Sequence, residues 1–225
     1  MEPPPSTAQD GLTGVGPLDF NNVCDVRAVA RMHIVNFPSS TEARLGLRFL
    51  ADIYYPYLVG EDLLACTVAH RDGQVVSFIS YTRFPSRFVN LGLRARPLKF
   101  SWGIVRACLT RLDALRAIVK PIQVTATRPV PGRGRSVPAG CGEVLKLATE
   151  EEHQTWIPPG GDARVTVRVF SAMEDYFRRA GFGRVLLRVL KNNTASNLFC
   201  HSMGCRIDTT TRRRSANHYW YDISP

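Results

Sequence analysis

The chain has 225 residues, of which 44% are hydrophobic and 21% charged, a composition typical of a folded protein with a core. Its net charge of +10 comes from one segment, because residues 83–135 hold twelve basic residues and a single acid. No uncharged apolar run approaches the ~20 residues of a membrane-spanning helix, and residues 1–16 lack the pattern of a secretory signal.

Six cysteines occur without a CxxC pair. In a chain of this length without a signal sequence, this pattern favours free thiols over disulfides. We therefore expect a cytoplasmic protein with no transmembrane segment.

The N-terminal half contains alternating helix and strand patterns. Prolines and glycines predict a flexible tail over residues 1–20, which leaves residues 21–225 as a single domain. Apolar alternation predicts a strand over residues 21–29, which passes into a helix over 28–35. Apolar residues at positions 43, 47, 50, 54 and 58, preceded by candidate caps at 39–41, predict a second helix. Residues 62–70 and 74–82, separated by Arg71-Asp72-Gly73, predict a β-hairpin.

The C-terminal half continues this alternation. An apolar stripe predicts a helix over residues 98–120, and the prolines and glycines of 121–142 predict a loop. Strands are expected over 143–149, 185–190 and 217–223, and helices over 163–180 and 194–203. This order indicates a mixed α/β protein in layers.

A glycine-bearing loop joins the strand at 143–149 to the helix at 163–180. The N-terminus of a helix presents unpaired N–H groups that suit a phosphate, and Gly160 and Gly161 allow a close approach of the backbone. An ordinary strand-to-helix connection explains these residues equally well.

The segment after the next strand carries a more specific signal. Asn193, Ser196, Phe199 and Gly204 stand at the spacing of the pattern N-x-x-A-x-x-F/Y-Y-x-x-x-G-F. With the order of elements, this spacing resembles the GCN5-related N-acetyltransferase (GNAT) superfamily over about residues 22–223. The resemblance implies a three-layer α/β fold (mixed α+β) with a central, mostly antiparallel sheet flanked by helices. Residues 83–140 would be a basic helical insert with a Pro/Gly-rich loop.

The phosphate loop departs from the family pattern Q/R-x-x-G-x-G/A. Gly161 and Ala163 keep its small residues, but a proline stands where Gln or Arg is expected. Counted from Gln154 instead, the polar residue is present and the glycines follow about three positions late. We expect a loop that is longer than usual.

The resemblance implies direct transfer of an acetyl group from acetyl-CoA to an amine. By this resemblance the cofactor-binding residues would be Gln154, Gly160, Gly161, Asp162 and Ala163 at the pyrophosphate, Leu147, Ala148 and Thr149 beside the pantetheine arm, and Asn193, Ser196 and Phe199 on its other side.

Acyl transfer to an amine needs a base for the amine proton and a donor for the oxyanion, which the family takes from a backbone N–H of the strand before the phosphate loop. Glu143 stands where family members place the base; Glu150–Glu152 and His153 are alternatives, and so is a purely structural Glu143.

Cys200 occupies the position of the family's general-acid tyrosine. A buried structural cysteine is the alternative, with Tyr219, Tyr221 or solvent as the acid. We expect no metal site, because Cys200, His201 and Cys205 lack paired ligand spacing.

We therefore predict an N-acetyltransferase, monomeric or homodimeric, that acts on a small-molecule or peptide amine. The basic helix is expected to form a lid over the acceptor, or a surface for an acidic partner or a membrane. Nucleic acid is a less favoured partner, because only Phe100 and Trp102 interleave its cations. Two alternative functions stay open: a nucleic-acid-binding module that uses residues 83–135, and a GNAT-like fold that binds a ligand without turnover.

Overall fold

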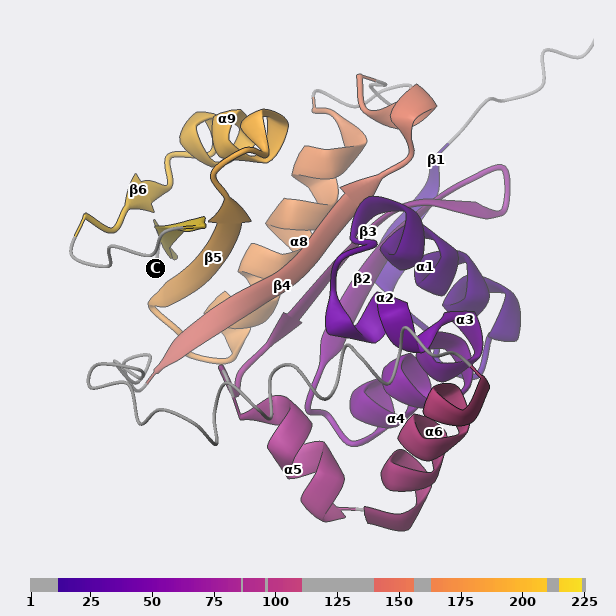
Figure 1. The fold of residues 1–225 in the computed structure, drawn as a ribbon. Helices are drawn as coiled ribbons and strands as arrows, with labels where there is room; N and C mark the ends of the chain where they lie inside the picture. Colours follow the sequence, from indigo (N-terminus) through magenta and orange to yellow (C-terminus); the bar gives the residue numbers. More distant parts are fainter. Residues whose placement is uncertain are drawn as a thin grey trace, which may run out of the picture.

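A computed structural model describes residues 12–85, 87–95, 97–110, 140–155, 163–209 and 215–223. Its centre is a seven-stranded sheet in the order β1-β2-β3-β4-β5-β7-β6 (Figure 1). The strands are β1 (Leu12–Pro17), β2 (Ala65–Arg71), β3 (Gln74–Thr82), β4 (Cys141–Thr149), β5 (Arg184–Leu190), β6 (Arg206–Ile207) and β7 (Ala216–Asp222). Neighbouring strands are antiparallel except β4 and β5, which are parallel.

Helices cover both faces of this sheet (Figure 1). One set comprises α1 (Val23–Asn36), α2 (Thr41–Leu45), α3 (Leu47–Phe49), the π-helix η1 (Leu50–Tyr54), α4 (Tyr55–Gly60), α5 (Phe88–Ala95) and α6 (Pro97–Thr110). The other set comprises α8 (Val165–Arg179) and α9 (Thr194–Ser202), and a short 3-10 helix, η2 (Glu151–His153), follows β4. The mixed three-layer fold expected from the sequence is confirmed. Among the described residues, no helix has the length and apolar character needed to cross a membrane.

Each face of the sheet has its own hydrophobic core. The α1-side core includes Val29, Leu50, Tyr55, Leu58 and Phe78, and the α8-side core includes Val169, Phe170, Met173, Phe177 and Val185. Because successive residues of a strand face opposite sides, β3, which is buried from Val75 to Thr82, contributes Phe78 to the first core and Ile79 to the second. This two-sided burial explains the continuous apolar runs of the central strands.

Two expectations for the first thirty-six residues are wrong. Leu12–Pro17, which falls within the expected flexible tail, forms the edge strand β1 and pairs with β2 through the backbone. The strand expected over residues 21–29 is the first half of α1. The Asn22 side chain accepts hydrogen bonds from the N–H groups of Cys24 and Asp25, and this cap starts the helix.

Other elements differ from the expectation in their extent. The single helix expected up to residue 58 is divided at Gly46, whose φ of 92° ends α2, and it then passes through the π-helix η1. The helix expected from residue 98 starts one residue earlier as α6, and α5 before it was not expected. Residues 111–139, with most of the expected loop, lie outside the described residues.

Gly142 lies where β4 packs against α8, and it leaves no room for a side chain. A Cβ at this position would stand 2.2 Å, 2.4 Å and 2.8 Å from three atoms of the Phe177 ring. That ring is fully buried and makes edge contacts with Tyr176 and Phe182. Gly142→Ala should therefore lower the free energy of unfolding by about 1–3 kcal/mol, measured by urea titration.

The matched control is Gly16→Ala in β1, where an added Cβ meets nothing within 4 Å. We expect it to change stability by less than about 0.5 kcal/mol. Equal stabilities of the two variants would contradict the packing described at Gly142.

Candidate active site

The two parallel strands β4 and β5 run side by side over only part of their length. Their pairing covers Cys141–Val144 of β4 and Arg184–Leu187 of β5. Beyond Val144, β4 continues for five more residues along β3, while β5 continues along β7 and separates from β4 (Figure 1). Residues 145–149 of β4 therefore lie inside the sheet without pairing to the neighbouring strand β5. This V-shaped divergence is an irregularity at the centre of the sheet.

A β-bulge marks the vertex of the divergence. Ser80 of β3 pairs with Lys146 and Tyr81 pairs with Val144, so Leu145 is an extra residue in β4. A bulge bends and twists its strand, which accounts for the separation from β5 directly after Val144. It also brings two successive side chains, Leu145 and Lys146, to the α1 side of the sheet.

The direction of the β4 backbone after the bulge follows from a hydrogen bond at its end. The Glu150 N–H donates to the Val76 carbonyl of β3. The backbone N–H and C=O groups of successive residues point to opposite neighbours of a strand. Those of Ala148 therefore also point towards β3, whereas those of Leu147 and Thr149 point towards β5. Since β5 has separated from β4 there, the open edge presents these backbone groups to whatever enters between the strands.

The N-terminus of α8 lies at the open end of this edge. The Thr166 hydroxyl is 2.8 Å from that of Thr149, which is 2.8 Å from that of Ser77 on β3, so hydroxyl hydrogen bonds join the start of α8 to the end of β4. The first turn of α8 has no acidic residue and no side-chain cap, and it carries Arg164 and Arg168. Its positive end is therefore reinforced and not neutralised.

Glu143 lies at the closed end of the divergence. It is 4% exposed, and its Oε1 is 3.1 Å from a guanidinium nitrogen of Arg188 on β5. The ion pair joins β4 to β5 where their backbone pairing ends, on the side of the sheet opposite Gly142 and α8. The predicted base therefore stands at the vertex, with its carboxylate on the α1 side.

Three further polar residues gather on the α1 side, and sequence reasoning missed them. Lys146 Nζ lies 4.0 Å from a Glu42 carboxylate oxygen and 5.0 Å from the centre of the Phe37 ring. Burial raises the pKa of Tyr54 well above its usual value, and the charges of Glu42 and Glu143 contribute to the same shift. Lys146 is flanked by Leu145 and Leu147, and in β5 Arg188 is likewise flanked by apolar residues, which was a usable sequence signal.

His33 lies fully buried on the same side, with Nδ1 2.8 Å from the Tyr55 hydroxyl and Nε2 3.1 Å from the Ser40 hydroxyl. Burial, helped by the charge of Lys146, lowers the pKa of His33 to about 3. The neutral ring is therefore favoured in the folded state. It contributes stability that is fully present above a pH of about 6.5 and is lost as the pH falls towards 3.

We expect this single group to reduce the free energy of unfolding by about 1.4 kcal/mol per pH unit below pH 6.5. His33→Gln should remove that contribution to the slope, as measured by urea unfolding at pH 6.5 and 4.5. Parallel losses of stability in the two proteins would refute the assignment of the slope to His33.

The predicted cofactor residues of α9 have local structural partners. Asn193 caps the helix, its Oδ1 accepting from the Ser196 N–H at 3.0 Å. Phe199 packs edge-on against Phe170 of α8 and so joins the two helices, and Ser196 is half-buried. The start of α9 therefore lies directly after β5, on the side of the divergence opposite β4. The role of these residues in cofactor binding stays a prediction.

The general-acid candidates lie on the α8 side. Cys200 is 2% exposed in the α8-side core, and its hydrogen bond with Cys205, together with burial, raises its pKa. The Tyr219 hydroxyl donates to Asn197 Oδ1 at 2.9 Å, and the Tyr221 hydroxyl donates to Glu174 Oε2 at 2.7 Å. Each candidate therefore faces away from the Glu143 carboxylate, and the acid role of Cys200 stays a prediction.

Of the predicted phosphate-loop residues, Gln154 is exposed just after η2 and Ala163 is half-buried just before α8. Gly160, Gly161 and Asp162 lie outside the described residues. The end of β4 and the start of α8, which flank this loop, are joined by the hydrogen bond between the hydroxyls of Thr149 and Thr166.

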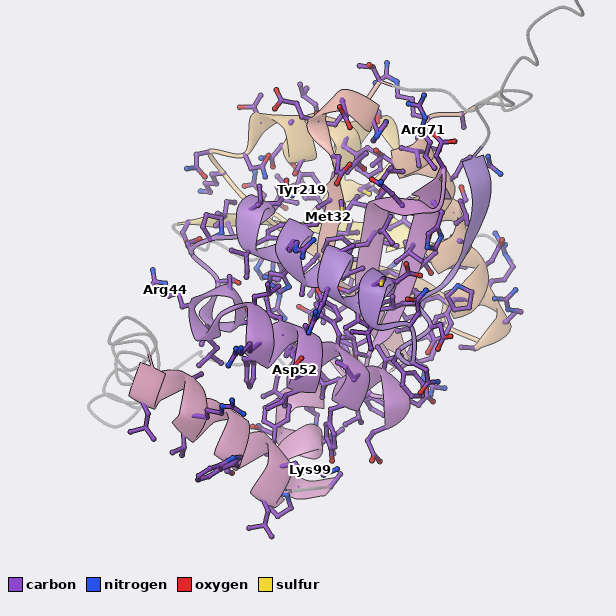
Figure 2. All side chains as sticks on the ribbon, turned by 90° about the vertical axis from the view of Figure 1, so that its right-hand side faces the viewer. Met32, Arg44, Asp52, Arg71, Lys99 and Tyr219 are labelled. Atoms are coloured by element: carbon purple, nitrogen blue, oxygen red, sulfur yellow. The ribbon has the colours of Figure 1, made fainter. Side chains whose placement is uncertain are left out.

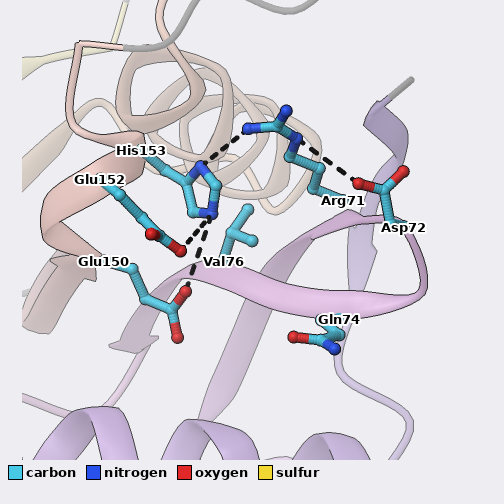
Figure 3. A pocket seen from close by; sticks show the side chains of 7 residues that line it. All are labelled: Arg71, Asp72, Gln74, Val76, Glu150, Glu152 and His153. Carbon is cyan, nitrogen blue, oxygen red and sulfur yellow. Dashed lines mark hydrogen bonds and ion pairs between the residues drawn. The ribbon is translucent and has the colours of Figure 1, made fainter. Parts of the chain in front are cut away.

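A pocket of about 330 Å³ lies beyond the end of β4, and Figure 3 shows its side chains. It is lined by Arg71, Asp72, Gln74, Val76, Glu150, Glu152 and His153. The His153 Nδ1 is 3.3 Å from an Arg71 nitrogen, and its Nε2 is 3.3 Å from Glu152 and 3.8 Å from Glu150.

Of the alternative base candidates, Glu150, Glu152 and His153 line this pocket, which lies away from the vertex. Because arginine only donates, Nδ1 of His153 accepts from Arg71, and Nε2 faces the carboxylates of Glu150 and Glu152. Glu150 directly follows β4, seven residues from Glu143, and with one bulge in between this corresponds to roughly 20 Å of extended chain. The two carboxylates therefore cannot serve one reaction centre.

No model of a protein family matches the sequence, and no curated protein matches it either. Solved structures do match. The PaiA N-acetyltransferase of Thermoplasma acidophilum in complex with coenzyme A is 10% identical, with a TM-score of 0.55 over 93% of this chain and 98% of that chain. A probable acetyltransferase of Staphylococcus epidermidis is 8% identical, with a TM-score of 0.53 over 94% of this chain and 99% of that chain. This is the GNAT fold.

Ard1 from Thermoplasma volcanium has the same fold, at 13% identity and a TM-score of 0.52, with 94% of this chain and 98% of that chain covered. The likeness extends over nearly the whole of both chains, so the GNAT fold includes the sheet and the helices on both of its faces. The fold expected from the spacing of Asn193, Ser196, Phe199 and Gly204 is thereby confirmed.

Proposed function

We propose that the chain is an N-acetyltransferase that moves an acetyl group directly from acetyl-CoA to a primary amine. The observation that carries the proposal is the divergence of β4 and β5, with a positive helix end at its open end and a buried carboxylate at its vertex. Among the neighbours, the Thermoplasma PaiA structure contains coenzyme A, which supports an acyl-CoA ligand for this fold.

The residues present fit coenzyme A. The first turn of α8, with Arg164 and Arg168, would hold the pyrophosphate, together with the loop that contains Gly160, Gly161 and Asp162. The outward N–H and C=O groups of Leu147 and Thr149 would hydrogen-bond the amides of the pantetheine arm as a neighbouring strand does. This arrangement directs the thioester towards the vertex, where Glu143 lies.

At the vertex the chain would perform three tasks. Glu143 accepts the proton of the amine, directly or through a water, so that a neutral amine attacks the thioester carbon. A backbone N–H at the open edge of β4 donates to the developing oxyanion. As the C–S bond breaks, the thiolate leaves and takes a proton from solvent, since Cys200, Tyr219 and Tyr221 face the α8 side.

The test is the release of CoA thiol from acetyl-CoA in the presence of a panel of amines: a polyamine, an amino sugar, lysine and peptides with free N-termini. Amine-dependent release with a mass gain of one acetyl group on the acceptor is the expected result. Transfer through a covalent acetyl-enzyme, seen as an acetylated protein in the absence of amine, would contradict direct transfer.

A second candidate is a GNAT fold that binds acyl-CoA without turnover. It is favoured by one observation: the three acid candidates expected from the sequence, Cys200, Tyr219 and Tyr221, lie on the α8 side of the sheet, opposite Glu143. Saturable CoA binding without thiol release from any amine of the panel would support it over the enzyme.

A further inference from the structure

Helix α6 has two apolar faces. Phe100, Gly103, Ile104 and Ala107 form the inner face, which packs on α3, η1 and α4: the Phe100 ring lies 5.8 Å from Phe49 and 5.9 Å from Tyr57. A Cβ at Gly103 would stand 2.1 Å from Ile53 Cδ1, so the helix backbone approaches η1 closely. Through this inner face, α6 is packed on the α1-side core.

The outer face is equally apolar and is exposed. It consists of Leu98, Trp102, Val105 and Leu109, which are 85%, 65%, 46% and 80% exposed. These positions lie about 180° around the helix from the inner face, at 100° per residue. We name these four residues the α6 stripe. Figure 2 shows α6 along an edge of the molecule, with Lys99 near its N-terminal end.

The charged residues of α5 and α6 are all cations. Lys99 and Arg106 lie seven residues apart on one flank of α6, and Arg87 and Arg94 belong to the segment just before it; all four are exposed. The whole segment from residue 83 to 135 holds one acid against twelve basic residues. A helix with an exposed apolar stripe, a tryptophan and flanking cations has the chemistry of a helix that lies on an anionic bilayer.

We propose that the α6 stripe docks the protein on an anionic membrane surface. The four apolar side chains would enter the boundary of the acyl chains, and the flanking cations would face the lipid phosphates. Two copies of the protein would bring like charges together at this face, which disfavours self-association. A nucleic acid would pair with the cations and leave the apolar stripe in water.

The test is flotation of the full-length protein with lipid vesicles. Vesicles with about 30% phosphatidylglycerol in phosphatidylcholine should retain the protein, and pure phosphatidylcholine should retain at least about fivefold less. Raising the salt from about 0.1 M to about 0.5 M should release it, because screening weakens the lipid attraction. Equal binding to both vesicle types, or no binding to either, would overturn the proposal.

The variant Leu98→Ser/Trp102→Ser/Leu109→Ser removes three residues of the stripe and should bind roughly 100-fold less. Its matched control is Val23→Ser/Val35→Ser/Leu198→Ser, three exposed apolar residues outside the stripe, which should bind as the wild type does. Lys99→Glu leaves the stripe intact and should weaken binding at least about fivefold, so the test stands even if the triple variant fails to fold.

Two other occupants of the stripe are outcomes that would overturn the proposal. One is a wild-type dimer in light scattering that the triple stripe variant converts to a monomer, without binding to vesicles. The other is retention on a random-sequence DNA duplex in the absence of vesicle binding.

Discussion

Glu143→Gln should lower kcat by about 100- to 1000-fold while leaving the affinity for acetyl-CoA within about threefold. The amide has the shape of the carboxylate and can still contact Arg188, but it cannot accept the proton of the attacking amine. The pantetheine arm and the pyrophosphate, which supply most of the binding, would lie beyond reach of this change, along residues 145–149 and at the start of α8. Steady-state thiol release and CoA binding are the two measurements.

The matched control is Glu152→Gln, in the pocket beyond the end of β4, which should retain full activity. Arg188→Gln distinguishes a catalytic role of Glu143 from a structural one. If the ion pair were purely structural, Arg188→Gln and Glu143→Gln would lose stability and activity to the same extent. Full activity of Glu143→Gln, or equal losses in Glu143→Gln and Glu152→Gln, would remove Glu143 from the reaction.

Proline substitution in β4 should have opposite consequences at two adjacent positions. Ala148→Pro deletes an N–H that faces β3 and should destabilise the protein by about 3 kcal/mol or more. Leu147→Pro deletes an N–H that faces the open edge, so it should leave the fold intact and weaken CoA binding about tenfold. Urea unfolding and calorimetric CoA titration measure the two effects.

Leu147→Ala is the control for the loss of the side chain, because it keeps the N–H and removes the packing against the α8-side core. Wild-type affinity in Leu147→Ala with weakened affinity in Leu147→Pro assigns the effect to the backbone. Equal affinities of these two variants would contradict the assignment of the open edge to the cofactor.

The elements that surround the divergence could be predicted from the sequence because their patterns are local. β4, α8, β5 and α9 were each expected within one or two residues, since each has its own apolar period and is bounded by loop or turn residues. The helix expected over residues 28–35 lies within α1, but β1 and the first half of α1 could not be predicted in this way. A short edge strand rich in glycine has no pattern of its own, and its conformation comes from pairing with β2, a segment some fifty residues away.

The site could be predicted only in part. The place of Glu143 on β4 followed from the resemblance, but its pairing with Arg188 depends on the sheet order, which brings β4 and β5 together across forty residues. The bulge at Leu145 has no sequence signal, because it is visible only against the register of β3. Glu42 and Tyr54 lie near Lys146 and Glu143 because α2 and η1 are on the same side of the sheet, a tertiary arrangement that no local sequence pattern reveals.

The central claim is that an acyl-CoA binds in the divergence of β4 and β5, on the N-terminus of α8. Calorimetric titration of the full chain with acetyl-CoA tests it most directly. We expect binding with a Kd of about 1–100 μM, and a ligand concentration of 100 Kd should stabilise the fold by about 2.7 kcal/mol. Arg168→Glu should weaken binding about tenfold, whereas Arg179→Glu, at the other end of α8, should not. No heat and no thermal stabilisation with either CoA or acetyl-CoA would contradict the claim.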